Sequence, residues 1–102
     1  MNTKLIKECG AEFIGTFALV FFGCGSMILH ELNPEAISPD SIPIIFGGII
    51  AVMVYTLGHI SGAHFNPAVS IAFYSVGLVD IKKIALFIPS QVLGAVSASL
   101  AH

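Results

Sequence analysis

The sequence carries little charge. Only 10 % of its 102 residues are Asp, Glu, Lys or Arg, whereas a soluble domain carries about 25 %. Because 56 % of the residues are apolar and the mean hydropathy is +0.95, the composition predicts a membrane protein. The formal net charge is -2, and no basic cluster is long enough to follow a nucleic-acid backbone. A nucleic-acid partner is therefore not expected.

Groups that carry redox, metal or covalent chemistry are also scarce. The two cysteines, Cys9 and Cys24, lie at or inside the first apolar run and are interpreted as small packing residues, without a disulfide framework. His59 and His64 have no third metal ligand nearby in the sequence. No Ser-His-Asp or Cys-His arrangement stands in a supporting motif. We expect no metal, no cofactor and no enzymatic activity.

Long apolar runs make up most of the sequence. Three runs, at about residues 11–29, 44–60 and 84–100, have the length of membrane-spanning helices, which need roughly 17 to 25 residues. Residues 30–43 form a polar loop with prolines and acidic side chains between the first two runs. The sequence predicts an all-α membrane protein in which residues 1–102 form one unit.

The first apolar run follows Lys4 and Lys7, as the apolar core of a signal peptide would. However, Glu12 interrupts this run and two further spans follow it. We therefore interpret the run as a transmembrane helix that is retained in the mature protein.

A shorter segment, residues 61–76, lies between the second and third spans. Its Gly-rich turn leads into Asn66-Pro67, which is typical of a helix start because Asn caps and Pro tolerates the first helical position. The helix from Pro67 to Val76 is too short to cross a bilayer. Non-helical backbone at membrane depth is tolerated where it is buried in protein or lines a watery cavity. The segment is predicted to be a re-entrant half-helix in the wall of a pore or substrate cavity.

The lysines support this topology. Lys4 and Lys7 precede the first span, and Lys82 and Lys83 precede the third. All four lie on one side only if the half-helix returns to the side it came from. The positive-inside rule makes that side cytoplasmic, so we expect a cytoplasmic N-terminus.

Three motifs resemble one family in its order and spacing. Residues 58–70, GHISGAHFNPAVS, resemble the first Asn-Pro-Ala loop of the aquaporin, or major intrinsic protein, family. Residues 11–16 look like its first-helix opening, and residues 91–95 look like its third-helix motif. The resemblance covers essentially the whole chain, but only the first of the family's two inverted repeats. It implies half of an aquaporin-like fold: three transmembrane helices plus one re-entrant half-helix.

The resemblance implies a channel component in the cell membrane for passive transport of water or a small neutral solute. The Asn66 amide would donate a hydrogen bond to passing water, and the carbonyls of the preceding loop would accept hydrogen bonds from it. A helix N-terminus carries roughly +0.5 of a charge, which opposes cations and protons. The pore residues that follow from the resemblance are Asn66, Pro67, Ala68, Gly62, Ala63, His64, Phe46 and Ile50.

Selectivity is expected to depend on the second span. The family places an aromatic residue twenty positions before the asparagine, and here that residue is Phe46. Water-selective members favour Phe or His there and glycerol facilitators favour Trp, so the resemblance favours water; half of a glycerol facilitator is the alternative. Ile50, four residues on, would face the same wall.

Two polar residues inside apolar spans need partners. A carboxylate such as Glu12 costs about 2.5 to 3.5 kcal/mol within a span, so it acts either in a proton relay or as a structural brace for the loop. The resemblance favours the brace, with Gln91 in a similar role.

Half a pore is expected to be inactive alone and to need a second aquaporin-like half or a full-length partner. Family members commonly form tetramers with a pore in each subunit. The competing hypothesis is a non-transporting remnant or assembly subunit that packs through two faces of small residues, Gly47/Ala51 and Gly94/Ala98. Solute flux separates these hypotheses.

Overall fold

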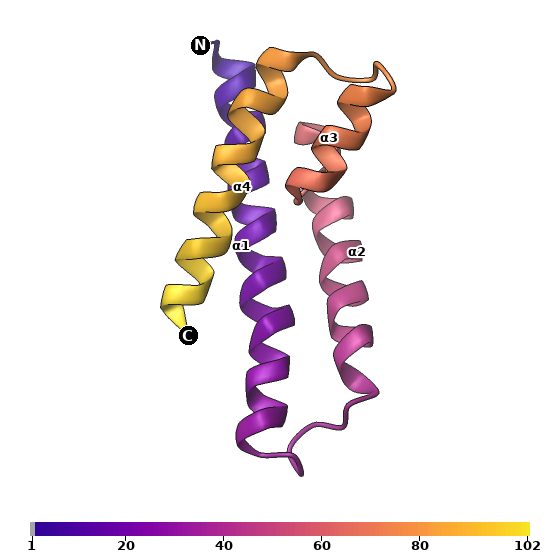
Figure 1. Cartoon of the computed structure of the whole chain (residues 1–102), viewed down its shortest axis with the longest axis vertical. Coiled ribbons are helices and arrows are strands. Elements are labelled where there is room, and N and C mark those ends of the chain that lie inside the picture. The colour runs from indigo at the N-terminus through magenta and orange to yellow at the C-terminus, as the bar shows by residue number, and fades with distance from the viewer. Residues whose placement is uncertain (1) are drawn as a thin grey trace.

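The computed structural model describes residues 2–102, which form four helices and no strand. In chain order these are α1 (Thr3–Leu32), α2 (Ser41–Ser61), α3 (Pro67–Ser75) and α4 (Ile81–Ala101) (Figure 1). Helices α1, α2 and α4 are long and apolar enough to cross a membrane. The predicted all-α fold of three spanning helices and one short helix is confirmed.

Local capping residues explain where α1 and α4 begin. The Asn2 side chain accepts a hydrogen bond from Leu5 N at 2.7 Å, and the Asp80 side chain accepts one from Lys83 N at 2.9 Å. These caps start α1 and α4 in polar sequence, so both helices extend beyond the apolar runs at residues 11–29 and 84–100. Hydropathy marks the part of a helix that suits lipid, whereas backbone hydrogen bonding continues into the polar flanks.

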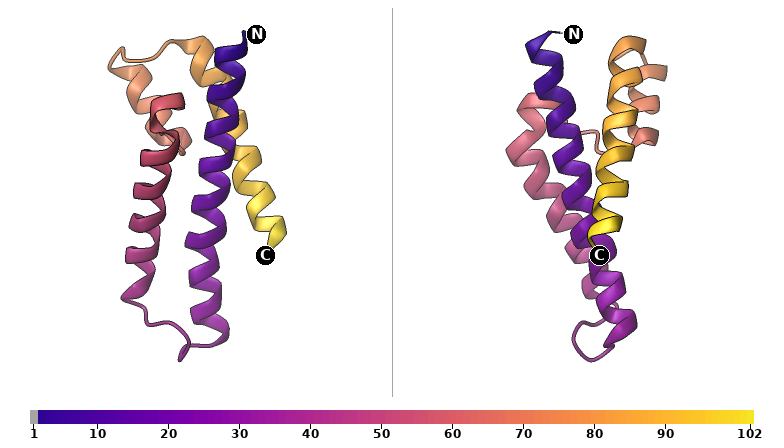
Figure 2. Two further views of the ribbon diagram at one scale, coloured as in Figure 1. Left: turned by 180° about the vertical axis from the view of Figure 1, so that it is seen from behind. Right: turned by 90° about the vertical axis from the view of Figure 1, so that its left-hand side faces the viewer.

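Helix α1 is the central element of the arrangement. It packs against α4 and against α2, while α3 packs against α4. Figures 1 and 2 show α1 between α2 and α4 over much of its length. The molecule measures 47 × 25 × 22 Å along its principal axes, with its long dimension parallel to the three long helices.

The segment after α2 turns back on itself. Helix α2 runs toward the end of the molecule where α1 begins, the loop at residues 62–66 dips back between the helices, and α3 returns to that same end (Figure 1). As a result the first turns of α1 and α4 lie together, opposite the loop that joins α1 to α2 (Figure 2). The four lysines, at positions 4, 7, 82 and 83, are thus gathered at one end of the molecule.

Only one of the two small-residue faces is free. A Cβ added at Gly94 would lie 2.5 Å from Phe13 O of α1, and Ala98 is fully buried. This face is therefore used within the chain, which corrects the expectation that it would serve assembly. Gly47 has no atom within 4 Å of an added Cβ, and both Gly47 and Ala51 are exposed on α2.

Candidate pore loop

The loop between α2 and α3 has an unusual backbone. Helix α2 ends at Gly62, whose φ of 89° is left-handed and whose N–H bonds to Gly58 O at 2.8 Å. Two residues with side chains, Ala63 (φ 58°) and Phe65 (φ 54°), are also left-handed. Each such residue costs on the order of 1 to 3 kcal/mol and persists only where its surroundings hold it. The loop therefore depends on contacts with the helices around it.

Glu12 of α1 supplies most of those contacts. Its Oε2 accepts hydrogen bonds from Ser61 Oγ at 2.6 Å and His64 N at 3.2 Å. Its Oε1 accepts from Phe65 N at 2.8 Å and Gln91 Nε2 at 2.7 Å. The side chain is 0 % exposed. An ionised carboxylate only accepts hydrogen bonds, at about four positions, so four donors saturate it. Burial of this charge is compensated by hydrogen bonds that fix the loop backbone.

Gln91 extends this network to the half-helix. Its Nε2 also lies 3.0 Å from Ser70 Oγ of α3, and Ser70 Oγ lies 2.7 Å from His64 Nδ1. Since an amide only donates through nitrogen, Ser70 accepts from Gln91 and has its own O–H available for His64. All three side chains are buried. The network thus ties α4, α3 and the loop to each other as well as to α1.

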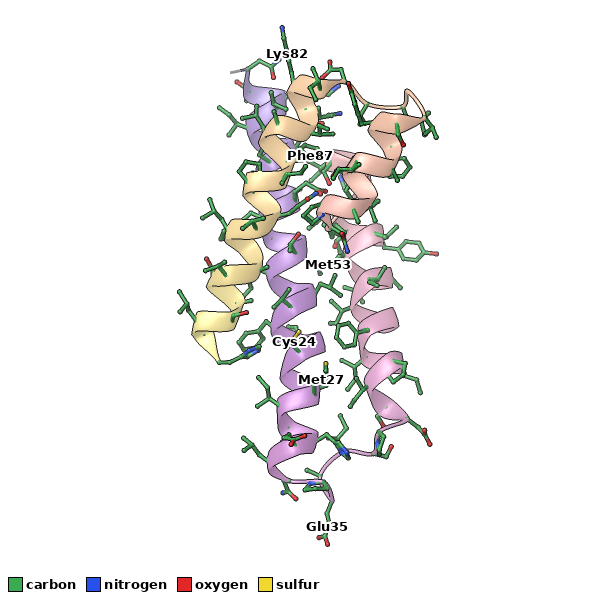
Figure 3. The ribbon with its side chains drawn as sticks, viewed as in Figure 1. Cys24, Met27, Glu35, Met53, Lys82 and Phe87 are labelled. Atoms are coloured by element: carbon green, nitrogen blue, oxygen red, sulfur yellow. The ribbon has the colours of Figure 1, made fainter. Side chains whose placement is uncertain are left out.

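Aromatic rings complete the surroundings of His64. Its ring centroid lies 4.7 Å from that of Phe73 and 5.1 Å from that of Phe87. Phe87 belongs to α4 and is fully buried; Figure 3 labels it where α4 approaches α3. The His64 side chain is therefore held on three sides, and the loop presents backbone rather than this ring.

Asn66 has a different environment. Its Oδ1 accepts a hydrogen bond from Ala68 N at 2.7 Å, which caps α3, and Pro67 occupies the first helical position. The residue is exposed, and within residues 2–102 its amide nitrogen has no hydrogen-bond partner. The side chain is thus oriented by its own helix start while its N–H groups stay free to donate.

The remaining predicted pore residues lie in varied surroundings. Gly62 and Ala68 are exposed and Ala63 is half-buried. Ile50 is 45 % exposed on α2. Phe46 packs its ring against Gly23 of α1, where a Cβ would collide with it. Within residues 2–102, hydrogen bonds bring together Glu12, Gln91 and His64, and none of these bonds involves Phe46 or Ile50.

Several residues that hold the loop could not be identified from the sequence alone. Ser61 is ordinary in an apolar sequence and becomes informative only when its partner Glu12 is known. The Phe65 ring packs where a Cβ of Gly15 would be, so Gly15 makes room for the loop. A signal did exist for Ser70, which follows the Asn66 cap by one helical turn and shares its side of α3.

A cavity of ≈ 300 Å³ lies beside the start of α3. Helices α1 and α4 and the residues Phe65, Asn66 and Pro67 line it. Two buried polar atoms of lining residues, Thr16 Oγ1 and Gln91 Oε1, have no partner within residues 2–102. Over the same residues, no group of three His, Cys, Asp or Glu side chains is placed to hold a metal ion.

Comparison with known protein families gives a match that includes this loop and almost all of the chain. The family model described as major intrinsic protein matches residues 1–101. The chain belongs to the major intrinsic protein family. The resemblance seen in the three sequence motifs is therefore confirmed.

Curated relatives place the chain among aquaporins. Aquaporin NIP1-1 of Arabidopsis thaliana is 46 % identical over 97 % of this chain, which corresponds to 33 % of the relative. Nodulin-26 of Glycine max is 38 % identical over 97 % of the chain and 36 % of the relative. Aquaporin Z of Photorhabdus laumondii is 40 % identical over 93 % of the chain and 42 % of the relative. This major intrinsic protein chain thus spans about a third of the length of the plant relatives.

Membership of this family and the three apolar helices both indicate a location in the membrane. Helices α1, α2 and α4 are each long enough and apolar enough to cross a membrane. The chain is therefore an integral membrane protein.

Proposed function

We propose that this chain forms half of the wall of a pore through which water crosses the cell membrane passively. The observation that carries the proposal is the half-helix α3, which begins at Asn66 partway along the bundle and presents a free amide there. A polar helix start at membrane depth is tolerated where it lines a watery cavity. The relatives' printed names, which include several aquaporins, support the same class of transport.

Water passing the loop would meet donors and acceptors in fixed positions. The Asn66 amide donates a hydrogen bond to the water oxygen, and the carbonyls of Gly62, Ala63 and His64 accept from its hydrogens. Their left-handed neighbours fix the direction of these carbonyls. Glu12 and Gln91 act as the brace: they hold the loop without touching water, because each is fully buried.

The same arrangement disfavours ions. The N-terminus of α3 carries roughly +0.5 of a charge, and neither Asp nor Glu lies in its first turn to offset it. A cation that sheds water beside this helix end is repelled, whereas a neutral molecule is not. Phe46 favours water over glycerol as the solute, with Ile50 on the same wall; transport of glycerol or another small neutral solute is the alternative.

The complete pore requires a second part. We infer that a second aquaporin-like half, in the same polypeptide or in a partner, contributes the opposite wall, because the relatives are about three times as long as this chain. The N-terminus lies in the cytoplasm in this proposal, and complete pores associate as tetramers. The apolar cavity beside Asn66 and Pro67 suits contact with that second half.

The decisive experiment replaces the free amide and keeps the cap. Asn66→Asp retains an oxygen for Ala68 N but removes the N–H donors and adds a negative charge. Loss of one hydrogen bond of about 1.4 kcal/mol corresponds to about tenfold, so we expect at least that reduction in osmotic water permeability. Stopped-flow light scattering of vesicles containing the protein that includes this chain measures it.

The matched control is Asn33→Asp, the same change at the exposed C-cap of α1 in the distant loop. It is expected to leave permeability unchanged. Unchanged flux in folded Asn66→Asp protein would contradict the role given to Asn66. A reconstituted protein that never raises osmotic permeability would instead favour the non-transporting assembly subunit.

A further inference from the structure

A second cavity lies far from the pore loop, at the lysine-rich end. Its volume is ≈ 450 Å³, and its lining comes from the start of α1, the turn after α3 and the start of α4. We propose that this cleft binds the phosphate headgroup of an anionic phospholipid of the surrounding bilayer.

The charges of the cleft favour an anion. Three of the chain's four lysines line it, together with Glu8 and Asp80. Glu8 is 4 % exposed and its Oε2 lies 2.6 Å from Lys83 Nζ, so those two charges compensate each other. Lys4 and Lys82 are exposed and, within residues 2–102, have no acidic partner. Two lysines without an acidic partner therefore line one cleft, and Asp80 is the remaining carboxylate among its lining residues.

Backbone dipoles act in the same direction. Helices α1 and α4 both begin at the same end of the molecule (Figure 1), and residues of their first turns line the cleft. Each helix start carries roughly +0.5 of a charge. Asp80 is the N-cap of α4, where its Oδ1 accepts from Lys83 N at 2.9 Å, so its negative charge offsets the dipole of α4, whereas α1 has no acidic residue in its first turn. The lining residues therefore carry one more positive than negative formal charge, to which the dipole of α1 adds, although the whole chain has a formal net charge of -2.

The cleft also lies at the right depth. Helix α1 has 30 residues, which span about 45 Å at roughly 1.5 Å per residue, whereas the hydrocarbon core is about 30 Å thick. The polar first turns of α1 thus reach the headgroup layer, and Lys82 projects from the same end (Figure 3). Leu5, Leu78 and Val79 give the cleft an apolar side that suits the glycerol and first acyl carbons of a lipid. Lysines mark the cytoplasmic leaflet, which is the anionic one.

A bound lipid would join two helices that otherwise meet at this end through the Glu8–Lys83 pair. The site is independent of the pore, because none of its lining residues belongs to the loop at residues 62–66 or to the Glu12 network.

Native mass spectrometry of the detergent-solubilised protein that contains this chain tests the proposal. Phosphatidylglycerol is the probe, and phosphatidylcholine is the uncharged comparison. A lysine near an anionic surface contributes about 1 kcal/mol, or about fivefold in affinity. We expect Lys4→Gln and Lys82→Gln each to weaken phosphatidylglycerol retention by about that factor. Lys4→Arg and Lys82→Arg, which keep the charge, should retain it.

Lys7→Gln is the matched control. Lys7 is exposed on the same helix and at the same end, but it lines a different hollow beside α2. Its removal changes the net charge equally and should leave retention unchanged. An equal loss in Lys7→Gln would mean diffuse attraction to any anionic surface and would overturn the proposal.

Two further outcomes would also overturn it. One is full retention of phosphatidylglycerol by the double variant Lys4→Gln/Lys82→Gln. The other is displacement of the lipid by an equal concentration of inorganic phosphate, which would identify a site for free anions. Neither outcome bears on water permeability, so the lipid site and the pore are tested independently of each other.

Discussion

Glu12 is the residue on which the conformation of the loop depends most. Its four hydrogen bonds reach Ser61, two backbone N–H groups of the loop, and Gln91. Two of these donors belong to the backbone of a segment with left-handed residues. A buried donor left without an acceptor costs about 1 to 3 kcal/mol, so this carboxylate offsets strain that the loop could not otherwise sustain.

Glu12→Gln should therefore destabilise the protein. The substituted amide has one oxygen in place of two, and its N–H₂ group would face a donor. We expect a loss of about 2 kcal/mol, typical of a hydrogen bond to a charged group, together with lower water permeability. Denaturant unfolding in detergent and stopped-flow permeability measure the two effects.

Glu35→Gln is the matched control, because Glu35 is exposed at the tip of the loop between α1 and α2 (Figure 3). It should alter neither quantity. Wild-type stability in Glu12→Gln would show that the brace is dispensable.

At this scale the sequence identified some residues of the network and missed others. Glu12 and Gln91 stand out because a carboxylate and an amide in an apolar span must find partners. Ser61 does not stand out, because a hydroxyl can bond within its own helix. Its partner Glu12 is 49 positions away, and Gln91 is 79 positions from Glu12. Such distances leave no local pattern in the sequence.

Among the elements, α1 and the loop have the closest fit. Gly15 leaves space on α1 that the Phe65 ring occupies, and Phe65 is 4 % exposed. The left-handed φ of Phe65 directs the ring to this place. One helix therefore provides both the hydrogen bonds and the packing surface for the re-entrant segment.

Gly15→Ala should displace this ring. An added methyl would collide with Phe65, and overpacking of this kind costs about 1 to 3 kcal/mol. We expect a lower unfolding temperature and reduced water permeability, since Phe65 precedes Asn66 directly.

Gly10→Ala on the same helix is the control. A Cβ there meets no atom within 4 Å, so the substitution should be neutral or stabilise the helix by up to about 1 kcal/mol. Equal effects of the two substitutions would show that packing of Phe65 is not the reason why position 15 requires glycine.

Helix ends show what local sequence can predict. Asn66 and Pro67 marked the start of α3, and the structure has the cap and the first-turn proline there. The starts of α1 and α4 lie in polar sequence that hydropathy excluded. Capping is an interaction of neighbours, so sequence shows it, whereas the extent of an apolar run only sets a minimum length for the helix.

Considered as a whole, the molecule has two chemically different ends. The lysines lie where α1 and α4 begin, and the acidic loop with Glu31, Glu35 and Asp40 lies at the other end. Figure 3 shows Glu35 and Lys82 at opposite ends. If α3 does not cross the bilayer, these two positions lie on opposite sides of it.

Cysteine accessibility tests this topology. With Cys9 and Cys24 replaced by alanine, we introduce Glu35→Cys or Lys82→Cys and label intact cells with a membrane-impermeant maleimide. Glu35→Cys should react from outside, and Lys82→Cys only after permeabilisation. Labelling of both from outside would mean that α3 crosses the membrane. Labelling of each position in only part of the molecules would mean dual topology.

The sequence by itself determined the membrane class, the three spans, and the short helix with its Asn-Pro start. These are properties of composition, of continuous apolar runs, or of residues within one helical turn. Only the tertiary structure decided what holds the loop: the four donors around Glu12, the Ser70 link to His64, and the fit of Phe65 on Gly15. Those contacts join segments distant in the chain, and they form only when α1, α4 and the re-entrant loop are packed together.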